Sequence, residues 1–240
     1  MTGFPMPRKR WNLCLLLAAL AITGCAEAPV PGMSSLNPWL RKEWAEDEKL
    51  GTTYYQKQTE LANVRSRAGS YAPAERQQIV TQLAARYKQE PGRVLRADII
   101  RTLAAFSDPL AEETLLLAAT DQDTTVRRLA CEGLGSRKST EALNSLAQTV
   151  GTDTEAEVRV AAARSLRNFK DPIAVRALGV ALEENDATMQ FVAMDSLKVV
   201  TGKSYGTSVP AWKEYVQGGS PAPVPGPSIA SQMRDWLYWY

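Results

Sequence analysis

Leucines recur along the middle of the chain at a nearly constant distance. Four of them are separated by 31, 32 and 31 residues: Leu103, Leu134, Leu166 and Leu197. Eight residues before each leucine stands another apolar side chain: Leu95, Val126, Val158 and Met189. A period of roughly 20–50 residues is typical of stacked supersecondary units, so the pattern predicts an array of repeats. Positions within a repeat are counted below from the earlier apolar residue as position 0.

Each repeat reads as two helices. Its first half carries apolar or small residues on one helix face, at positions 0, 4, 5 and 8. The pairs Asp108-Pro109 and Asp171-Pro172 place an N-cap carboxylate before proline at the first helical position, and Ser139 or Thr140 can cap the middle repeat. An upstream apolar group has the spacing of the second helix of a divergent first repeat: Ile79, Val80, Leu83 and Tyr87. One helix pair cannot bury its own apolar face, so the sequence predicts an all-α, right-handed α-α superhelix.

Two first helices carry a recognisable pattern. The segments Val126-Arg127-Arg128-Leu129-Ala130 and Val158-Arg159-Val160-Ala161-Ala162-Ala163 resemble the core of HEAT repeats, in particular the short variety first noted in phycobilisome lyases. The resemblance covers roughly residues 73–217 and implies an armadillo-like helical solenoid. The sequence from Leu197 to Trp212 resembles the closing element of bacterial HEAT proteins. It implies a C-terminal cap made by Trp212, Tyr215 and Val216, with a ligand-binding aromatic pair as the alternative.

Charged residues also follow the repeat. Arginine occupies position 1 in three repeats, as Arg96, Arg127 and Arg159. Such a stripe could bind an anionic ligand, but in HEAT-type solenoids this arginine usually pairs with carbonyls or with an acidic neighbour, which favours a structural ladder. Position 6 alternates in sign and predicts a row of ion pairs between repeats: Arg101, Glu132, Arg164 and Asp195. Cys131 stands at an apolar position, which predicts a buried thiol.

The N-terminus has the layout of a secretory signal peptide. Three basic residues, Arg8 to Arg10, precede a ten-residue apolar run that is about half of the length needed to span a bilayer. The following Ile22-Thr23-Gly24-Cys25 resembles the lipobox of bacterial lipoproteins. This resemblance implies cleavage before Cys25, a thioether-linked diacylglycerol on its sulfur and acylation, for example by palmitate, of the new amino group. An ordinary signal peptide with a nearby cysteine is the alternative.

These patterns divide the chain into six segments. They are a signal peptide (1–24), a lipidated N-terminus with a flexible tether (25–38), a partly helical extension (39–72), the repeat domain (73–217), a Pro/Gly linker (218–228) and an aromatic tail (229–240). Tryptophan and tyrosine are favoured at protein and membrane interfaces, so the tail reads as a docking element with four candidate partner-binding residues: Trp236, Tyr238, Trp239 and Tyr240. Alternatively, the tail folds back on a groove of the protein itself.

Composition narrows the possible functions. The 240 residues include 45% apolar side chains, which is enough for a packed core, and 28 basic against 26 acidic residues. Removal of 1–24 would leave 25 basic residues and a net charge of −1, so bulk charge gives no reason to expect nucleic-acid binding. The chain has no histidine, the commonest general base and zinc ligand, and no catalytic motif. After cleavage and lipidation, only Cys131 would remain as a thiol.

The sequence therefore predicts a non-enzymatic scaffold or adaptor, held to a membrane by lipid on Cys25 and binding an unidentified protein partner. No cofactor, metal, nucleic acid or small-molecule substrate is expected. The predicted location is the bacterial cell envelope, and Ala26 after the lipidated cysteine favours the outer over the inner membrane in a Gram-negative host. Two alternatives remain: a lyase-like or enzyme-associated factor acting on a protein, and a structural envelope protein.

Overall fold

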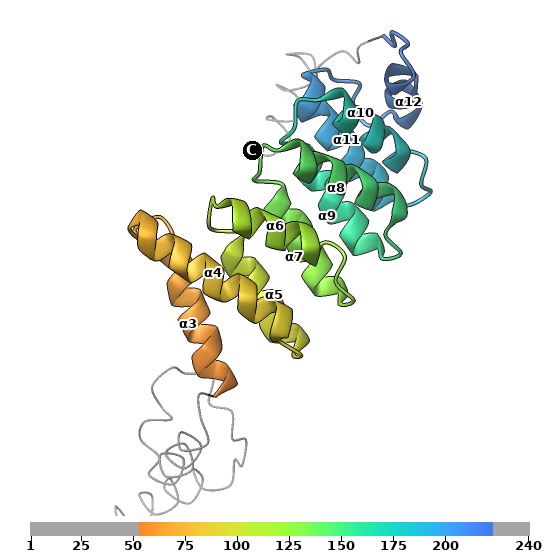
Figure 1. Ribbon diagram of the computed structural model, residues 1–240. Helices are drawn as coiled ribbons and strands as arrows, with labels where there is room; N and C mark the ends of the chain where they lie inside the picture. Colours follow the sequence, from red (N-terminus) through yellow and green to blue (C-terminus); the bar gives the residue numbers. More distant parts are fainter. Residues whose placement is uncertain (1–52, 223–240) are drawn as a thin grey trace, which may run out of the picture. The chain divides into compact units, whose positions relative to one another are not determined.

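Helices account for the regular structure of residues 53–222, the part of the chain that the computed structural model describes (Figure 1). Within this range no strand is formed. The helices are α3 (Tyr54–Ser66), α4 (Pro73–Gln89), α5 (Arg93–Leu103), α6 (Pro109–Ala118), α7 (Thr124–Leu134), α8 (Thr140–Thr152), α9 (Ala156–Leu166), α10 (Pro172–Ala181), α11 (Ala187–Thr201) and α12 (Val209–Val216).

The helices from α4 onward form two layers. The first helices of the repeats, α5, α7, α9 and α11, pack on one another in sequence. The second helices, α4, α6, α8, α10 and α12, form the other layer in the same way (Figure 1). Each helix therefore contacts its neighbours in the adjacent repeats as well as its partner. This arrangement confirms the predicted all-α solenoid.

Helix starts follow the predicted capping residues. The carboxylates of Asp108 and Asp171 accept hydrogen bonds from the amides of Leu110 and Ile173, at 2.9 and 2.7 Å. In both cases proline follows at the first helical position, where its missing N–H is not needed. Ser139 caps α8 through the Ala142 amide. The second helices thus begin where the sequence indicates.

The core lies between the two layers. Position 4 of each repeat is fully buried and is mostly small: Ile99, Ala130, Ala162 and Ala193. Position 8 holds the four periodic leucines, which are equally inaccessible. Close approach of the first helices also requires Gly135, because a Cβ there would lie 2.8 Å from the Ser165 side chain. Small residues therefore set the spacing of this layer.

The C-terminal end is closed by α12. Gly202 adopts the left-handed conformation (φ 70°) that ends α11, and the chain then returns across the last repeat. Trp212 is 1% exposed, and its indole N–H donates to the Gly206 carbonyl at 3.1 Å. The rings of Tyr205 and Tyr215 pack against that indole. Helix α12 covers α10 and α11, as expected for a cap.

The N-terminal part contains the divergent first repeat. Helix α4 carries the predicted group from Ile79 to Tyr87, and its Val80, Ala84 and Tyr87 are buried. Helix α3 lies within the region 39–72 that was predicted to be partly helical. Leu61 and Val64 of α3 pack against the core without being fully buried. Side chains of α3 and α4 therefore border a space that the core does not fill.

Candidate functional site

The three position-1 arginines form a continuous ladder along one edge of the stack. Arg127 donates from Nε and Nη2 to the two carboxylate oxygens of Asp153, at 2.8 and 3.0 Å. Its Nη1 donates to the carbonyls of Asp121 and Gln122, in the loop that precedes its own helix. Each guanidinium therefore ties its own loop to the loop of the next repeat.

The same geometry repeats on either side. Arg96 makes a two-pronged ion pair with Asp121 and donates to the carbonyls of Glu90 and Pro91. Arg159 pairs with Glu184 in the same way and donates to the carbonyls of Asp153 and Thr154. Nε, Nη1 and Nη2 of all three arginines are engaged. The ladder geometry thus serves to fix the repeats, and it leaves these groups committed to protein acceptors rather than to an anionic ligand.

The acidic partners have shifted ionisation. Burial alone would raise the pKa of Asp121, but hydrogen bonds from Arg96, the Asp123 amide and Tyr87 outweigh it and lower that pKa below its usual value. For Asp153, burial is likewise outweighed by Arg127 and the Glu155 amide, so its pKa is also lowered. Both carboxylates are therefore held in the charged form that the arginines need.

The ladder has two distinct ends. At the N-terminal end, the Tyr87 hydroxyl donates a hydrogen bond to Asp121 at 2.7 Å. The pKa of Tyr87 is raised, mainly by burial and also by this hydrogen bond. At the C-terminal end, Gln190 stands at position 1 and donates to the Glu184 and Leu182 carbonyls. An amide can continue the contacts to the loop but has no charge to pair with a further carboxylate. The loops of the ladder lie along the right-hand edge in Figure 1.

The acidic partners of the ladder arginines were not predicted, although their spacing in the sequence repeats. Asp121, Asp153 and Glu184 are separated by 32 and 31 residues, which is the period of the leucines. The period of the apolar residues does not by itself reveal this series of acidic residues. The pairing itself could have been expected from the shared period.

The predicted row of ion pairs at position 6 is wrong. Arg101 pairs with Asp98 and Glu132 with Arg128, in both cases within one helix. Asp195 does reach the preceding repeat, but its partner is Arg167, at 3.4 Å. Side chains three or four residues apart on a helix are nearest neighbours, so they compete successfully with the adjacent repeat.

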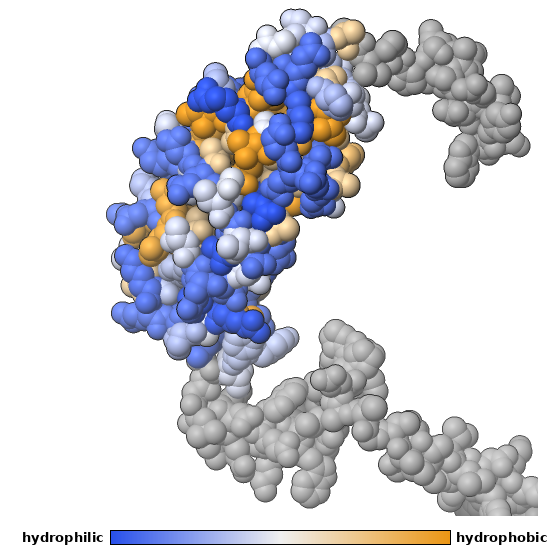
Figure 2. Space-filling view, turned by 90° about the vertical axis from the view of Figure 1, so that its right-hand side faces the viewer, coloured by the Kyte–Doolittle hydropathy of each residue, from blue (hydrophilic) through white to orange (hydrophobic). Residues whose placement is uncertain are grey.

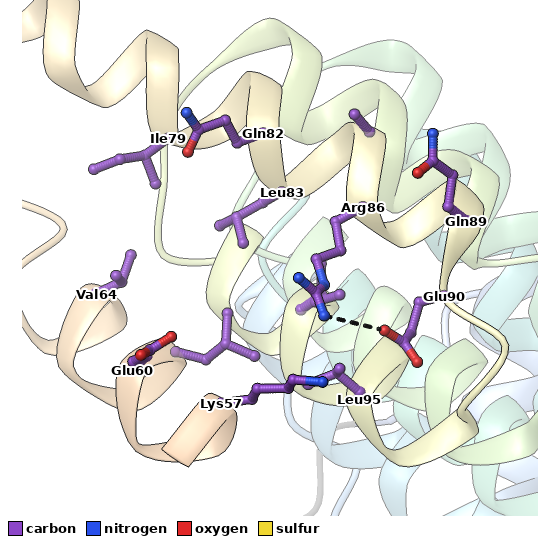
Figure 3. A pocket seen from close by; sticks show the side chains of 13 residues that line it. Lys57, Glu60, Val64, Ile79, Gln82, Leu83, Arg86, Gln89, Glu90 and Leu95 are labelled. Carbon is purple, nitrogen blue, oxygen red and sulfur yellow. Dashed lines mark ion pairs between the residues drawn. The ribbon is translucent and has the colours of Figure 1, made fainter. Parts of the chain in front are cut away.

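A groove lies between α3, α4 and α5. It has a volume of about 720 Å³. Its apolar lining comes from all three helices: Leu61, Val64, Ile79, Leu83, Leu95 and Ile99. In Figure 3, Val64 of α3 and Leu83 of α4 point into the space between the two helices. An apolar surface of this kind suits a partner's apolar side chains.

The rim of the groove is charged. Arg86 of α4 forms a 3.7 Å ion pair with Glu90, the residue that follows this helix (Figure 3), and Lys57 and Glu60 stand on α3. The groove therefore combines an apolar floor with a rim of both charges, on which neither Lys57 nor Glu60 forms an ion pair within residues 53–222.

Polar contacts hold α3 beside this groove. The Gln58 side-chain amide donates to Asp98 of α5 at 2.7 Å, and the Thr102 hydroxyl donates to the Leu61 carbonyl at 3.4 Å. Asp98 is 7% exposed and stands at position 3, where the later repeats have Leu129, Ala161 and Val192. Among the first helices of the repeats, α5 alone has a carboxylate at this position, and this carboxylate binds α3 through Gln58.

The hydropathy of one edge of the solenoid changes along its length. Figure 2 views the edge that carries the ladder, and hydrophobic residues gather there over the half of the stack nearer α12. The large exposed apolar residues Val180 and Phe191, at 55% and 61% exposure, belong to that half. Hydrophilic residues prevail around α3 to α5 in this view.

Cys131 is fully buried, as predicted. Burial raises its pKa to about 12, so the thiol is not ionised at neutral pH. Within the described part of the chain, no cluster of metal-ligating side chains is present. Nor does any helix between residues 53 and 222 combine the length and apolarity needed to cross a bilayer.

Several predicted site residues lie outside residues 53–222. These are the lipidation site Cys25 with its lipobox, and the tail residues Trp236, Tyr238, Trp239 and Tyr240.

Comparison with known sequences agrees with the helix pairing. Residues 80–167 match the model of a family described as HEAT repeats. These helix pairs are HEAT-like repeats. The match extends from α4 through α9, and the same helix pairing continues to α12. No curated protein matches the chain.

Proposed function

We propose that this protein is a scaffold or adaptor that binds another protein through the groove between α3, α4 and α5. The observation that carries the proposal is the groove itself, because four apolar side chains of its lining, Leu61, Val64, Ile79 and Leu83, are only partly buried within residues 53–222. HEAT-like repeats generally mediate protein interactions, which supports a binding role.

The chemistry of the groove defines the partner. Its apolar floor fits a partner helix with an apolar face, of the kind that presents anchors at i, i+3, i+4 and i+7. Lys57 and Glu60 at the rim suit a partner with charged residues of both signs beside those anchors. The ladder holds the repeats together before binding, so little ordering of this surface has to accompany association.

The proposed role is non-enzymatic. In this role the protein needs only surface complementarity, without cofactor or small-molecule substrate. A lyase-like or enzyme-associated factor and a structural envelope protein remain the alternatives that share this repeat type or location.

Photocrosslinking in the producing cells tests the groove. A photoreactive residue replaces Gln82, which lines the groove, or Gln78, which is exposed on α4 but does not line it. We expect one discrete protein adduct from position 82 that is lost when Leu83→Glu is added. The same adducts from both positions, or none from position 82, would contradict the proposal.

We further propose that lipid on Cys25 anchors the protein in the bacterial cell envelope, at the outer membrane in a Gram-negative host. The support is the lipobox Ile22-Thr23-Gly24-Cys25 after a basic and apolar leader. Each buried methylene contributes about 0.8 kcal/mol to membrane binding, so several acyl chains hold a protein firmly. Cys25→Ser should move the protein from the membrane to the soluble fraction, and its retention in the membrane would argue against lipid anchoring.

A further inference from the structure

A second hollow lies at the C-terminal end of the stack, between α10, α11 and α12. Its volume is about 560 Å³. Four half-buried apolar side chains line it: Val175, Val200, Tyr215 and Val216. The hollow is distinct from the groove beside α3, with which it shares no residue.

The repeat explains why space remains there. Position 11 holds Phe106 in the first full repeat and Phe169 in the third, and both are buried. The last repeat has Val200 at this position, which lies within the longer helix α11 and is only half-buried. The buried ring that follows the first helix in those two repeats therefore has no counterpart at position 11 here, and the hollow opens beside Val200.

Two cations border the hollow. Lys170 and Arg176 line it, and neither forms an ion pair within residues 53–222. The one carboxylate of the lining, Asp171, already accepts a hydrogen bond from the Ile173 amide. The hollow thus has an apolar lining with two cations at its border that form no ion pair there.

The chain itself supplies an apolar segment close to this hollow. Residues 229–240 carry apolar side chains at the spacing of one helix face: Ile229, Met233, Trp236, Leu237 and Tyr240. Tyr238 falls on the opposite side of the same helical projection, and Asp235 lies on that side too, away from the stripe.

The length of the connection permits this contact. Val216 lines the hollow and ends α12, and the chain continues to Ala222 within the described region. Only residues 223–228 then separate Ala222 from Ile229, and in extended proline-rich form they span roughly 20 Å. The segment 229–240 is therefore tethered close to the hollow.

We propose that residues 229–240 fold back on the hollow and cover Val175, Val200 and Tyr215. Trp236 and the other apolar residues of the stripe pack on these side chains. Tyr238 remains on the outer side. This contact is independent of the proposed partner groove.

Disulfide trapping tests the contact in the full chain carrying Cys25→Ser, which prevents lipidation. The reporting pair is Val175→Cys with Met233→Cys, and the matched control is Val180→Cys with Met233→Cys. Val180 lies on the same helix, is 55% exposed and does not line the hollow. With glutathione disulfide as oxidant and dilute protein, we expect the first pair to close an intramolecular bond several-fold faster. Thr201→Cys, also at the hollow, provides a second reporting pair.

The alternative positions of the segment give different results. Equal rates for the reporting and control pairs would show a free segment and overturn the proposal. Disulfide-linked dimers as the main product would assign the hollow to a second copy. Loss of the bond on adding vesicles of phosphatidylethanolamine and phosphatidylglycerol would assign the segment to a lipid surface. The last two results would also overturn the proposal.

Discussion

Arg137 occupies position 11 in the second repeat, where Phe106 and Phe169 fill the neighbouring turns. It is 8% exposed, and its Nε has no hydrogen-bond partner. Its Nη2 donates two long hydrogen bonds, of 3.3 and 3.4 Å, to the Leu103 and Ala104 carbonyls. Burial lowers its pKa, while the charges of Glu112 and Asp108 oppose this shift. A buried cation thus stands where its neighbours have a ring.

Arg137→Phe should stabilise the protein. The substitution removes a poorly paired buried charge and places in the turn the side chain that fits the equivalent turns. We expect the free energy of unfolding to rise by about 1 kcal/mol, since well-packed apolar replacements of buried charges are often stabilising. Urea unfolding followed by circular dichroism measures this change. A less stable variant would mean that the two carbonyl contacts outweigh the cost of burial.

The ladder carboxylates should make stability depend on acidic pH. The pKa of Asp121 lies below its ordinary value of 3.8 in the folded protein, so folding favours the ionised form. Its contribution is complete above that ordinary value and is lost as the pH falls through the lowered pKa. Asp121→Asn should therefore be less stable at neutral pH and lose less further stability on acidification. Unfolding at a series of pH values checks this, and an unchanged slope below the ordinary value would contradict it.

At the scale of helices, two glycines allow the effect of close helix packing to be distinguished from the effect of helix propensity. Gly135 has an ordinary helical conformation, yet a Cβ there would lie 2.8 Å from the Ser165 Cβ. Gly135→Ala should lower the free energy of unfolding by about 1–3 kcal/mol through overpacking. Urea unfolding measures the loss, and Ser165→Gly in the same chain should recover most of it.

Gly151 in α8 is the matched control. A Cβ there would find its nearest neighbour, Val180, at 3.9 Å, which is ordinary contact. Gly151→Ala should raise stability by up to about 1 kcal/mol, because alanine favours the helix more than glycine. If both glycine variants were stabilised, the spacing of α7 and α9 would not depend on Gly135.

Most of the helices could be predicted because their signals are local. An N-cap followed by proline at Asp108 and Asp171 requires no knowledge of the neighbouring repeat. The position-6 row failed because the sequence does not tell whether Glu132 turns to its own helix or to the next one. The groove also escaped prediction, since α3 is held by Gln58 and by the Leu61 carbonyl rather than by periodic apolar residues.

At the scale of the whole molecule, the ladder links repeats that otherwise contact only their nearest neighbours. Asp121 illustrates the linkage, because its carboxylate binds Arg96 and its carbonyl binds Arg127. Asp153 does the same for Arg127 and Arg159. In a stack with nearest-neighbour coupling, the weakest interface decides where cooperativity fails. A break at Arg127 should therefore divide the solenoid near its middle.

Arg127→Gln should lower the stability of the junction between α7 and α9 by about 3 kcal/mol, because it leaves the carboxylate of Asp153 buried without its partner. That carboxylate is 8% exposed in the intact pair. We expect hydrogen exchange to accelerate in the helices that meet at this junction, and urea unfolding to broaden as the two halves separate. Both measurements report on coupling rather than on the loss of a single contact.

Arg128→Gln provides the control from the adjacent residue. Arg128 pairs with Glu132 within α7, and both side chains are partly exposed, at 30% and 49%. Such a pair contributes about 0–1 kcal/mol, so this variant should keep the cooperative unfolding of the unmodified chain. Equal effects of the two substitutions would show that the apolar layers alone couple the repeats. A selective effect at Arg127 would show that the charged edge makes the stack one cooperative unit, able to present its grooves as fixed surfaces.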